Sequence, residues 1–194
     1  MNLPNKLTLL RVFLIPFFLL FIYLDIPFHF LIALVIFAAA SITDALDGKI
    51  ARKRNLVTNF GKFLDPLADK VLVIAALTVF VELKEVNMGA IPLIIITARE
   101  FMVSGLRLLA ANSGVVVAAG IWGKLKTAFT MVTIVGVLFW ISLCHDFSFG
   151  IPCKVQDIVN DIAVPVLIWI STALTVISGA VYLKGYWNLI DSDK

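Results

Sequence analysis

Histidine and cysteine are scarce in this sequence of 194 residues, which contains two of each. With so few of these ligands, a zinc site built from His and Cys is not expected. The two cysteines, Cys144 and Cys153, lie nine residues apart in an irregular stretch, residues 144–161. In an oxidising compartment they could form a disulfide, and otherwise they are free thiols; both alternatives stay open.

Charge is scarce as well. Charged residues make up 15% of the chain and hydrophobic residues 61%, whereas soluble domains are about a quarter charged and about half apolar. This composition excludes an ordinary soluble domain. The sequence has no basic-aromatic patch typical of nucleic-acid binding, and no linker, repeat or low-complexity segment. We therefore expect one domain over residues 1–194, with no nucleic-acid partner.

Long apolar runs dominate what is present. A helix needs about 20 mostly apolar residues to cross the hydrocarbon layer of a membrane, and six runs meet that length. We therefore predict an all-α integral membrane protein with six transmembrane helices. The predicted spans cover residues 8–25, 28–48, 61–83, 88–110, 121–144 and 160–186.

The first apolar run follows Lys6 and Arg11 and lacks a small-residue cleavage site, so we expect it to remain as a span. Just before it, Leu3, Leu7 and Leu10 recur at helical spacing beside polar residues. This pattern predicts a short N-terminal interfacial helix that leads into the first span.

Basic residues fall almost entirely on one side of the predicted membrane. Of the 16 Lys and Arg residues, only Lys84 and Lys154 fall on the far side if the N-terminus is cytoplasmic. By the positive-inside rule, both termini are then cytoplasmic. The net charge of +3 suits contact with anionic lipid headgroups, and we expect a multi-pass protein of the cell membrane.

Four aspartates interrupt the apolar pattern where the second and third spans meet. Asp44 and Asp47 lie about 60° apart around a helix, and Asp65 and Asp69 about 40° apart, so each pair shares a face. The short loop between the spans makes the two helices antiparallel neighbours. Four close carboxylates cannot all ionise without cations between them. All-oxygen ligands favour two Mg²⁺ ions, with Mn²⁺ as the alternative.

An alternative interpretation makes these aspartates solvated residues at helix ends. Asp65 followed by Pro66 matches an N-cap residue with proline at the first helical position. Charges at membrane depth are rare and usually functional, and all four aspartates share one phased pattern. We therefore favour the metal site.

Small residues lie close to the aspartates. Gly48 follows Asp47 directly, and Gly61 comes four residues before Asp65. Without a Cβ, each allows a ligand or a second helix to approach closely. Gly48 could therefore serve a ligand, or only the packing of spans two and three. Arg52 could hold a phosphate through two parallel hydrogen bonds.

Together these residues form the pattern D-x-x-D-G-x-x-A-R, then eight residues, then G-x-x-x-D-x-x-x-D, over residues 44–69. This pattern resembles the signature of the CDP-alcohol phosphatidyltransferase family without a departure. The segments NLPNKLTLLR, TAREFMVSGLR and GKLKTA are similar to the branch of that family that uses glycerol 3-phosphate. The resemblance covers essentially the whole chain.

The resemblance implies a two-metal transferase that acts on a CDP-linked lipid and releases CMP, commonly as a homodimer. It implies that Asp69 is the general base on the acceptor hydroxyl, and that the nucleotide lies against Gly48, Arg52 and Thr58. It also implies metal ligands at Asp44, Asp47, Asp65 and Asp69.

Basic residues in the second half of the chain indicate the kind of acceptor. Arg99 lies well inside the fourth span, and Arg107 follows about 80° around the helix. Lys124 and Lys126 begin the fifth span on the same side. This cationic cluster suits a phosphate-bearing acceptor, whereas choline needs an aromatic or acidic cage. Alternatively, Arg99 pairs with Glu100 structurally and the lysines only mark topology.

We therefore expect transfer of a phosphatidyl group from CDP-diacylglycerol to glycerol 3-phosphate, at an active site facing the cytoplasm. The same chemistry with inositol phosphate, serine or phosphatidylglycerol is the alternative within the family. Outside it, a cation or proton carrier could bury paired aspartates, but would not need the basic cluster. A scaffolding role in the membrane would give no reason for carboxylates at helical spacing.

Overall fold

A computed structural model describes residues 3–54, 59–112, 120–147 and 150–187. Within these ranges, side chains are described except at residues 3–4, 44–54, 59–63, 65–66 and 111–112. The described chain is helical, without strands. Its elements are α1 Leu3–Tyr23, α2 His29–Arg54, α3 Asn59–Glu82, the 3₁₀ turn η1 Lys84–Val86, α4 Ala90–Asn112, α5 Ile121–His145, α6 Cys153–Ile158, the π-helical turn η2 Val159–Ala163 and α7 Val164–Gly185.

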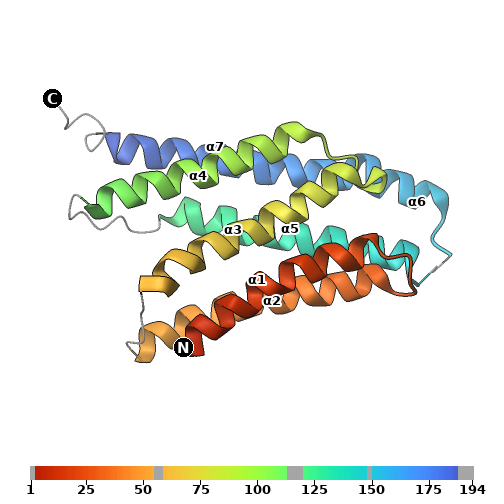
Figure 1. Cartoon of the computed structure of the whole chain (residues 1–194). Coiled ribbons are helices and arrows are strands. Elements are labelled where there is room, and N and C mark those ends of the chain that lie inside the picture. The colour runs from red at the N-terminus through yellow and green to blue at the C-terminus, as the bar shows by residue number, and fades with distance from the viewer. Residues whose placement is uncertain (1–2, 55–58, 113–119, 148–149, 188–194) are drawn as a thin grey trace.

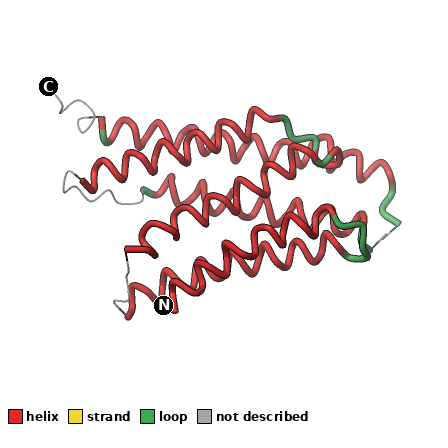
Figure 2. The backbone as a smooth tube through the Cα atoms, viewed as in Figure 1, coloured by secondary structure: helices red, strands yellow, loops and turns green. Residues whose placement is uncertain are grey.

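The long helices α1, α2, α3, α4, α5 and α7 lie side by side along one direction (Figure 1). At one end of the molecule α1 begins, α2 ends and α3 begins, α4 ends and α5 begins, and α7 ends (Figures 1 and 2). We call this the N-terminal end. The turn η1 and helix α6 lie at the opposite end (Figure 1).

Three of the described segments are long and apolar enough to cross a membrane, namely Asn5–Tyr23, Ile121–His145 and Cys153–Gly185, and His29–Thr43 is a shorter apolar helix. Each of the six predicted spans overlaps one of the long helices. Large apolar side chains such as Val132 and Leu108 point outward, as expected of a surface in contact with lipid. These helices are compatible with a membrane protein, and six crossings remain a prediction.

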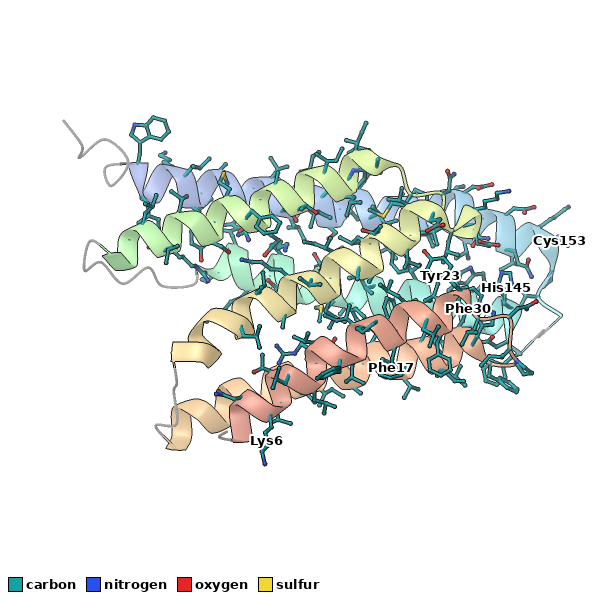
Figure 3. All side chains as sticks on the ribbon, in the orientation of Figure 1. Lys6, Phe17, Tyr23, Phe30, His145 and Cys153 are labelled. Atoms are coloured by element: carbon teal, nitrogen blue, oxygen red, sulfur yellow. The ribbon has the colours of Figure 1, made fainter. Side chains whose placement is uncertain are left out.

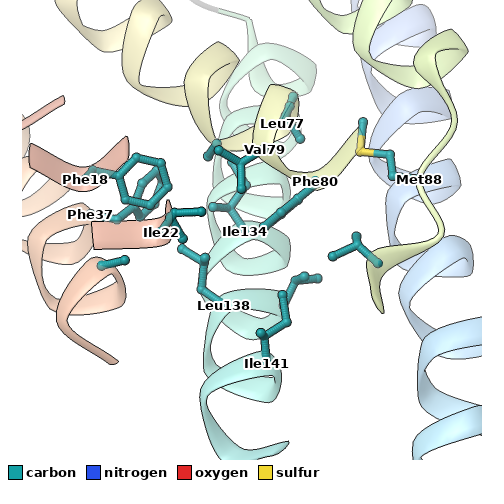
Figure 4. Close-up of a cluster of buried hydrophobic side chains, with 14 of the residues drawn as sticks. Phe18, Ile22, Phe37, Leu77, Val79, Phe80, Met88, Ile134, Leu138 and Ile141 are labelled. Atoms are coloured by element: carbon teal, nitrogen blue, oxygen red, sulfur yellow. The ribbon is translucent and has the colours of Figure 1, made fainter. Parts of the chain in front are cut away.

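Apolar packing joins α1, α2, α3 and α5 in the middle of the molecule and toward the end opposite the N-terminal end. The rings of Phe18 on α1 and Phe37 on α2 pack with centroids 5.7 Å apart. Phe80 on α3 and Leu138 on α5 belong to the same buried cluster (Figure 4). Buried aromatic and aliphatic side chains at native packing density stabilise the arrangement. This core holds the helices that carry the polar residues of the N-terminal end.

The prediction of a separate interfacial helix before the first span is wrong, because α1 runs without a break from Leu3 to Tyr23. Its polar residues Asn5, Thr8 and Arg11 recur every three residues, and all three are buried. They therefore face the rest of the protein, which removes the reason for a helix in the headgroup layer.

The helices α2 and α3 both extend further than predicted, so only residues 55–58 separate them. Because α3 begins at Asn59, Asp65 and Pro66 lie within the helix. The interpretation of Asp65 as an N-cap residue is therefore wrong.

At the opposite end, Asp146 fastens α5 to the start of α2. Its carboxylate accepts hydrogen bonds from the backbone N–H of Leu31, at 2.7 Å, and from the Ser142 hydroxyl, at 2.9 Å. Figure 3 shows His145 and Cys153 at this end, far from Lys6. Cys144 and Cys153 are both free thiols, so no disulfide closes this end.

Candidate active site

The backbone places the four aspartates at two matching depths below the N-terminal end. Asp44 precedes the last residue of α2 by ten positions, and Asp69 follows the first residue of α3 by ten. At about 1.5 Å per residue, both lie about 15 Å along their helices. By the same measure, Asp47 and Asp65 lie about 10 and 9 Å along. Since α2 ends where α3 begins (Figure 1), the four residues fall at two levels along the backbones of α2 and α3.

Several predicted site residues lie outside the described side chains, although α2 and α3 carry most of them. Gly48 and Arg52 belong to the last part of α2, and Thr58 falls between the two helices. Among the described side chains, no group of three or more His, Cys, Asp or Glu could hold a metal. Only Asp69 of the four aspartates is among those side chains, so the metal site stays a prediction.

Asp69 lines a small cavity between α3, α4 and α5. Its volume of about 30 Å³ leaves room for a water molecule or two. The cavity is formed by Asp69, Lys70 and Val73 of α3, Glu100 of α4, and Lys126, Thr127, Thr130 and Met131 of α5. Hence the predicted base and one predicted acceptor residue, Lys126, share one cavity.

Glu100 is the centre of an ion-pair network beside this cavity. Its Oε1 atom accepts hydrogen bonds from Lys126 Nζ and from Arg99 Nη1, the latter at 3.2 Å. The Lys126 residue is only 3% exposed and Arg99 only 9%. Buried charges are costly unless they are paired and hydrogen-bonded, so one carboxylate stabilises two buried cations.

Lys70 joins the network through a serine. Its ammonium group donates to the Ser104 hydroxyl, which itself donates to the backbone carbonyl of Glu100 at 2.9 Å. This links α3 to α4 next to Asp69. Sequence reasoning considered the Arg99–Glu100 pair but missed Lys70 and the bond from Lys126 to Glu100. A lysine directly after the last aspartate of the motif was the available signal.

Tyr182 on α7 brings the two predicted arginines together. Arg107 Nη2 donates to the Tyr182 hydroxyl at 2.8 Å, and the guanidinium carbons of Arg99 and Arg107 lie 5.5 and 5.4 Å from the centroid of its ring. Arg99 Nη2 also donates to Ser178 on α7, at 2.5 Å. Neither arginine lines the Asp69 cavity, but Arg99 reaches it through Glu100. Lys124 lies in the first turn of α5 and is exposed.

Arg11 is a further charged residue at this end that sequence reasoning assigned to the membrane surface. It is fully buried, and it lies eight residues, or about 12 Å, along α1. The helix α1 packs against both α2 and α3. Arg11 thus adds a buried positive charge on a helix that packs against both helices carrying the aspartates.

Known proteins bear out the resemblance. A sequence model of the family described as CDP-alcohol phosphatidyltransferase matches residues 1–178. The chain belongs to the CDP-alcohol phosphatidyltransferase family. The matched residues include the complete aspartate pattern and the Asp69 cavity.

Relatives in this family carry a more specific name. A protein of Bacillus subtilis (strain 168) is 39% identical over 97% of both chains, and one of Rickettsia bellii is 41% identical over 94% of both. One of Haemophilus influenzae is 45% identical over 71% of this chain and 76% of its own. Each is named CDP-diacylglycerol–glycerol-3-phosphate 3-phosphatidyltransferase.

Proposed function

We propose that this membrane protein transfers the phosphatidyl group of CDP-diacylglycerol to glycerol 3-phosphate and releases CMP. The full-length similarity to transferases of that name supports the reaction. The observation that carries the site is that Asp69 shares one cavity with Lys70 and Lys126. A base beside buried cations suits an acceptor that carries both a hydroxyl and a phosphate.

The aspartate faces fit the divalent ions on which this family generally depends. Aspartate carboxylates supply only oxygen ligands, which suits Mg²⁺, with Mn²⁺ as the alternative. The residues that would hold the ions are Asp44, Asp47, Asp65 and Asp69. When bound, such ions neutralise charge on the pyrophosphate and orient it for displacement.

The remaining chemistry belongs to the residues of the chain. The acceptor hydroxyl oxygen forms a bond to the phosphorus on the lipid side of the pyrophosphate. The bond between that phosphorus and the bridging oxygen breaks, and CMP leaves with this oxygen and its electrons. Asp69 takes the hydroxyl proton, so no covalent enzyme intermediate is required. Gly48, Arg52 and Thr58 would hold the nucleotide.

The basic cluster would bind the acceptor phosphate. Lys126 lines the cavity, whereas Arg99 and Arg107 do not line it and instead contact the ring of Tyr182. Lys124, exposed at the start of α5, would contribute at the entrance. A cation or proton carrier could also bury paired aspartates, but it would not need this cluster of Lys and Arg side chains.

We also propose that the N-terminal end faces the cytoplasm in the cell membrane, and that the protein works as a homodimer. The distribution of Lys and Arg supports the orientation. Resemblance to the family supports the dimer.

An acceptor screen tests the proposal. The purified protein in detergent receives CDP-diacylglycerol, Mg²⁺ and one of glycerol 3-phosphate, serine, inositol phosphate or phosphatidylglycerol, and CMP release is measured. We expect release with glycerol 3-phosphate that EDTA abolishes and excess Mg²⁺ restores. Release with another acceptor alone would refute the assignment.

A further inference from the structure

Tyr182 joins three helices through one buried oxygen atom. The residue is 4% exposed, near the end of α7. Its hydroxyl oxygen accepts hydrogen bonds from Arg107 Nη2, at 2.8 Å, and from the backbone N–H of Gly120, at 3.0 Å. Gly120 is the N-cap of α5. The phenol of α7 therefore fixes an arginine of α4 and the first turn of α5 at once.

The aromatic ring of Tyr182 contacts the side chains of two arginines of α4. The guanidinium carbons of Arg99 and Arg107 both lie within 5.5 Å of its centroid. The negative face of an aromatic ring attracts a cation within about 6 Å of its centroid. The ring thus contacts two arginines that lie eight residues apart on α4.

Two glycines leave the space that this arrangement needs. A Cβ atom at Gly179 would lie 3.1 Å from Arg99 Cγ, and one at Gly123 would lie 3.4 Å from the Tyr182 ring. The first distance is tighter than ordinary van der Waals contact. Close packing of this kind holds the arginine and the tyrosine in single positions.

Tyr182 also connects to the Asp69 cavity without lining it. Arg99 lies on its ring and donates to Glu100, which binds Lys126 in the cavity. The α5 turn that Tyr182 fixes through Gly120 leads directly to Lys126. Tyr182 is thus connected to Lys126 both through Arg99 and Glu100 and through the first turn of α5. Lys126 is one of the cations that would bind the acceptor phosphate.

We propose that Tyr182 is a positioning residue for the acceptor phosphate, which acts by holding Arg107 and the first turn of α5 in their binding positions. This inference rests on the proposed function and adds a specificity-determining residue to it. Tyr182 lies beyond residues 1–178, the part of the chain that the family model matches.

The test is Tyr182→Phe, which removes the hydroxyl and keeps the ring. We expect the KM for glycerol 3-phosphate to rise about 10-fold, as for loss of a hydrogen bond from a charged donor. The KM for CDP-diacylglycerol and the kcat at saturating acceptor should stay within about 2-fold. A residue that only positions the binding site of the acceptor affects neither lipid binding nor the rate of the bound complex.

Tyr186→Phe is the matched control. Tyr186 stacks on Tyr182 at 6.2 Å between centroids, and its variant should keep wild-type values of both KM. A second comparison uses Arg107→Ala. If Tyr182 acts through Arg107, adding Tyr182→Phe to Arg107→Ala should raise the acceptor KM far less than in the wild-type background.

Gly120→Pro keeps the inference testable if Tyr182→Phe does not fold. Gly120 has a φ of −65°, which proline adopts without strain at its own position, and the variant removes the N–H that donates to Tyr182. We expect a rise of a few-fold, on the order of one neutral hydrogen bond, in the acceptor KM alone.

Equal changes in both KM values, or none, in the folded variant would overturn the inference. If the wild-type protein does not use glycerol 3-phosphate at all, the proposed function itself has failed, and the acceptor screen shows this first.

Discussion

Asp69 is surrounded in its cavity by two lysines and one glutamate. In the proposed function, a carboxylate there would accept a proton from a hydroxyl of an acceptor whose phosphate lies near Lys126 and Lys70. The geometry resembles that of a general base placed beside a binding site for an anion. The two roles assigned to Asp69, base and metal ligand, can be separated by a substitution that keeps an oxygen.

Asp69→Asn should lower kcat by about 10²- to 10⁴-fold, the usual contribution of a positioned general base. CDP binding should weaken much less, because the amide oxygen can still serve as a ligand. Turnover and equilibrium CDP binding are measured on the same preparation. Asp157→Asn, at an exposed position on α6, is the control and should behave as wild type. A near-normal rate for Asp69→Asn across pH would remove Asp69 as the base.

Lys126→Ala should raise the KM for glycerol 3-phosphate by roughly 10- to 150-fold, since a partly desolvated contact to a phosphate is worth roughly 1.5–3 kcal/mol. The KM for CDP-diacylglycerol should change little. The exposed Lys124 should give a smaller rise when replaced by Ala, and Lys154→Ala, at the opposite end, should give none. Equal effects of Lys126→Ala on both substrates would place Lys126 outside the acceptor site.

At the scale of helices, much of the architecture could be predicted from local pattern. Runs of about 20 apolar residues predicted the approximate position of every long helix. The three- and four-residue spacings predicted that each aspartate pair shares one helix face. Helix ends were less predictable, because polar residues such as Asn5 and Arg11 look like surface residues until another helix covers them.

Contacts between distant helices could not be predicted. The bond from Lys126 to Glu100 crosses 26 residues, and the bond from Arg107 to Tyr182 crosses 75. Such pairs depend on which helix faces which, information that spacing within one helix does not contain. Tyr182 in particular looks like an ordinary tyrosine near a membrane boundary, and only the structure shows its hydroxyl between α4 and α5.

The role of α2 in binding can be tested at Gly48, which follows Asp47 in the final third of that helix. If this glycine serves the nucleotide, Gly48→Val should keep its thermal stability but fail to bind CDP. If it serves helix packing, the melting temperature should fall together with activity, and Gly48→Ala should restore both.

Gly136→Val is the control for the cost of valine in a membrane helix, because a Cβ at Gly136 meets nothing within 4 Å. The ligand interpretation fails if Gly48→Val binds CDP with wild-type affinity.

At the scale of the whole molecule, the ion-pair network and the main apolar core lie in different parts of the helices. The buried apolar cluster lies in the middle of the molecule and toward the end with η1 and α6. The residues Asp69, Glu100, Lys126 and Tyr182 lie in the other half. A water-soluble acceptor could reach this polar half from one membrane face, while a lipid donor could enter from the bilayer.

The central claim is that one protein joins these two substrates. The most direct measurement supplies proteoliposomes containing CDP-diacylglycerol with radiolabelled glycerol 3-phosphate and Mg²⁺, and follows labelled lipid and free CMP together. The account predicts that labelled phosphatidylglycerophosphate and CMP appear in equal amounts, and that both are lost in the Asp69→Asn variant. CMP release without labelled lipid, or labelled lipid formed equally well by Asp69→Asn, would contradict it.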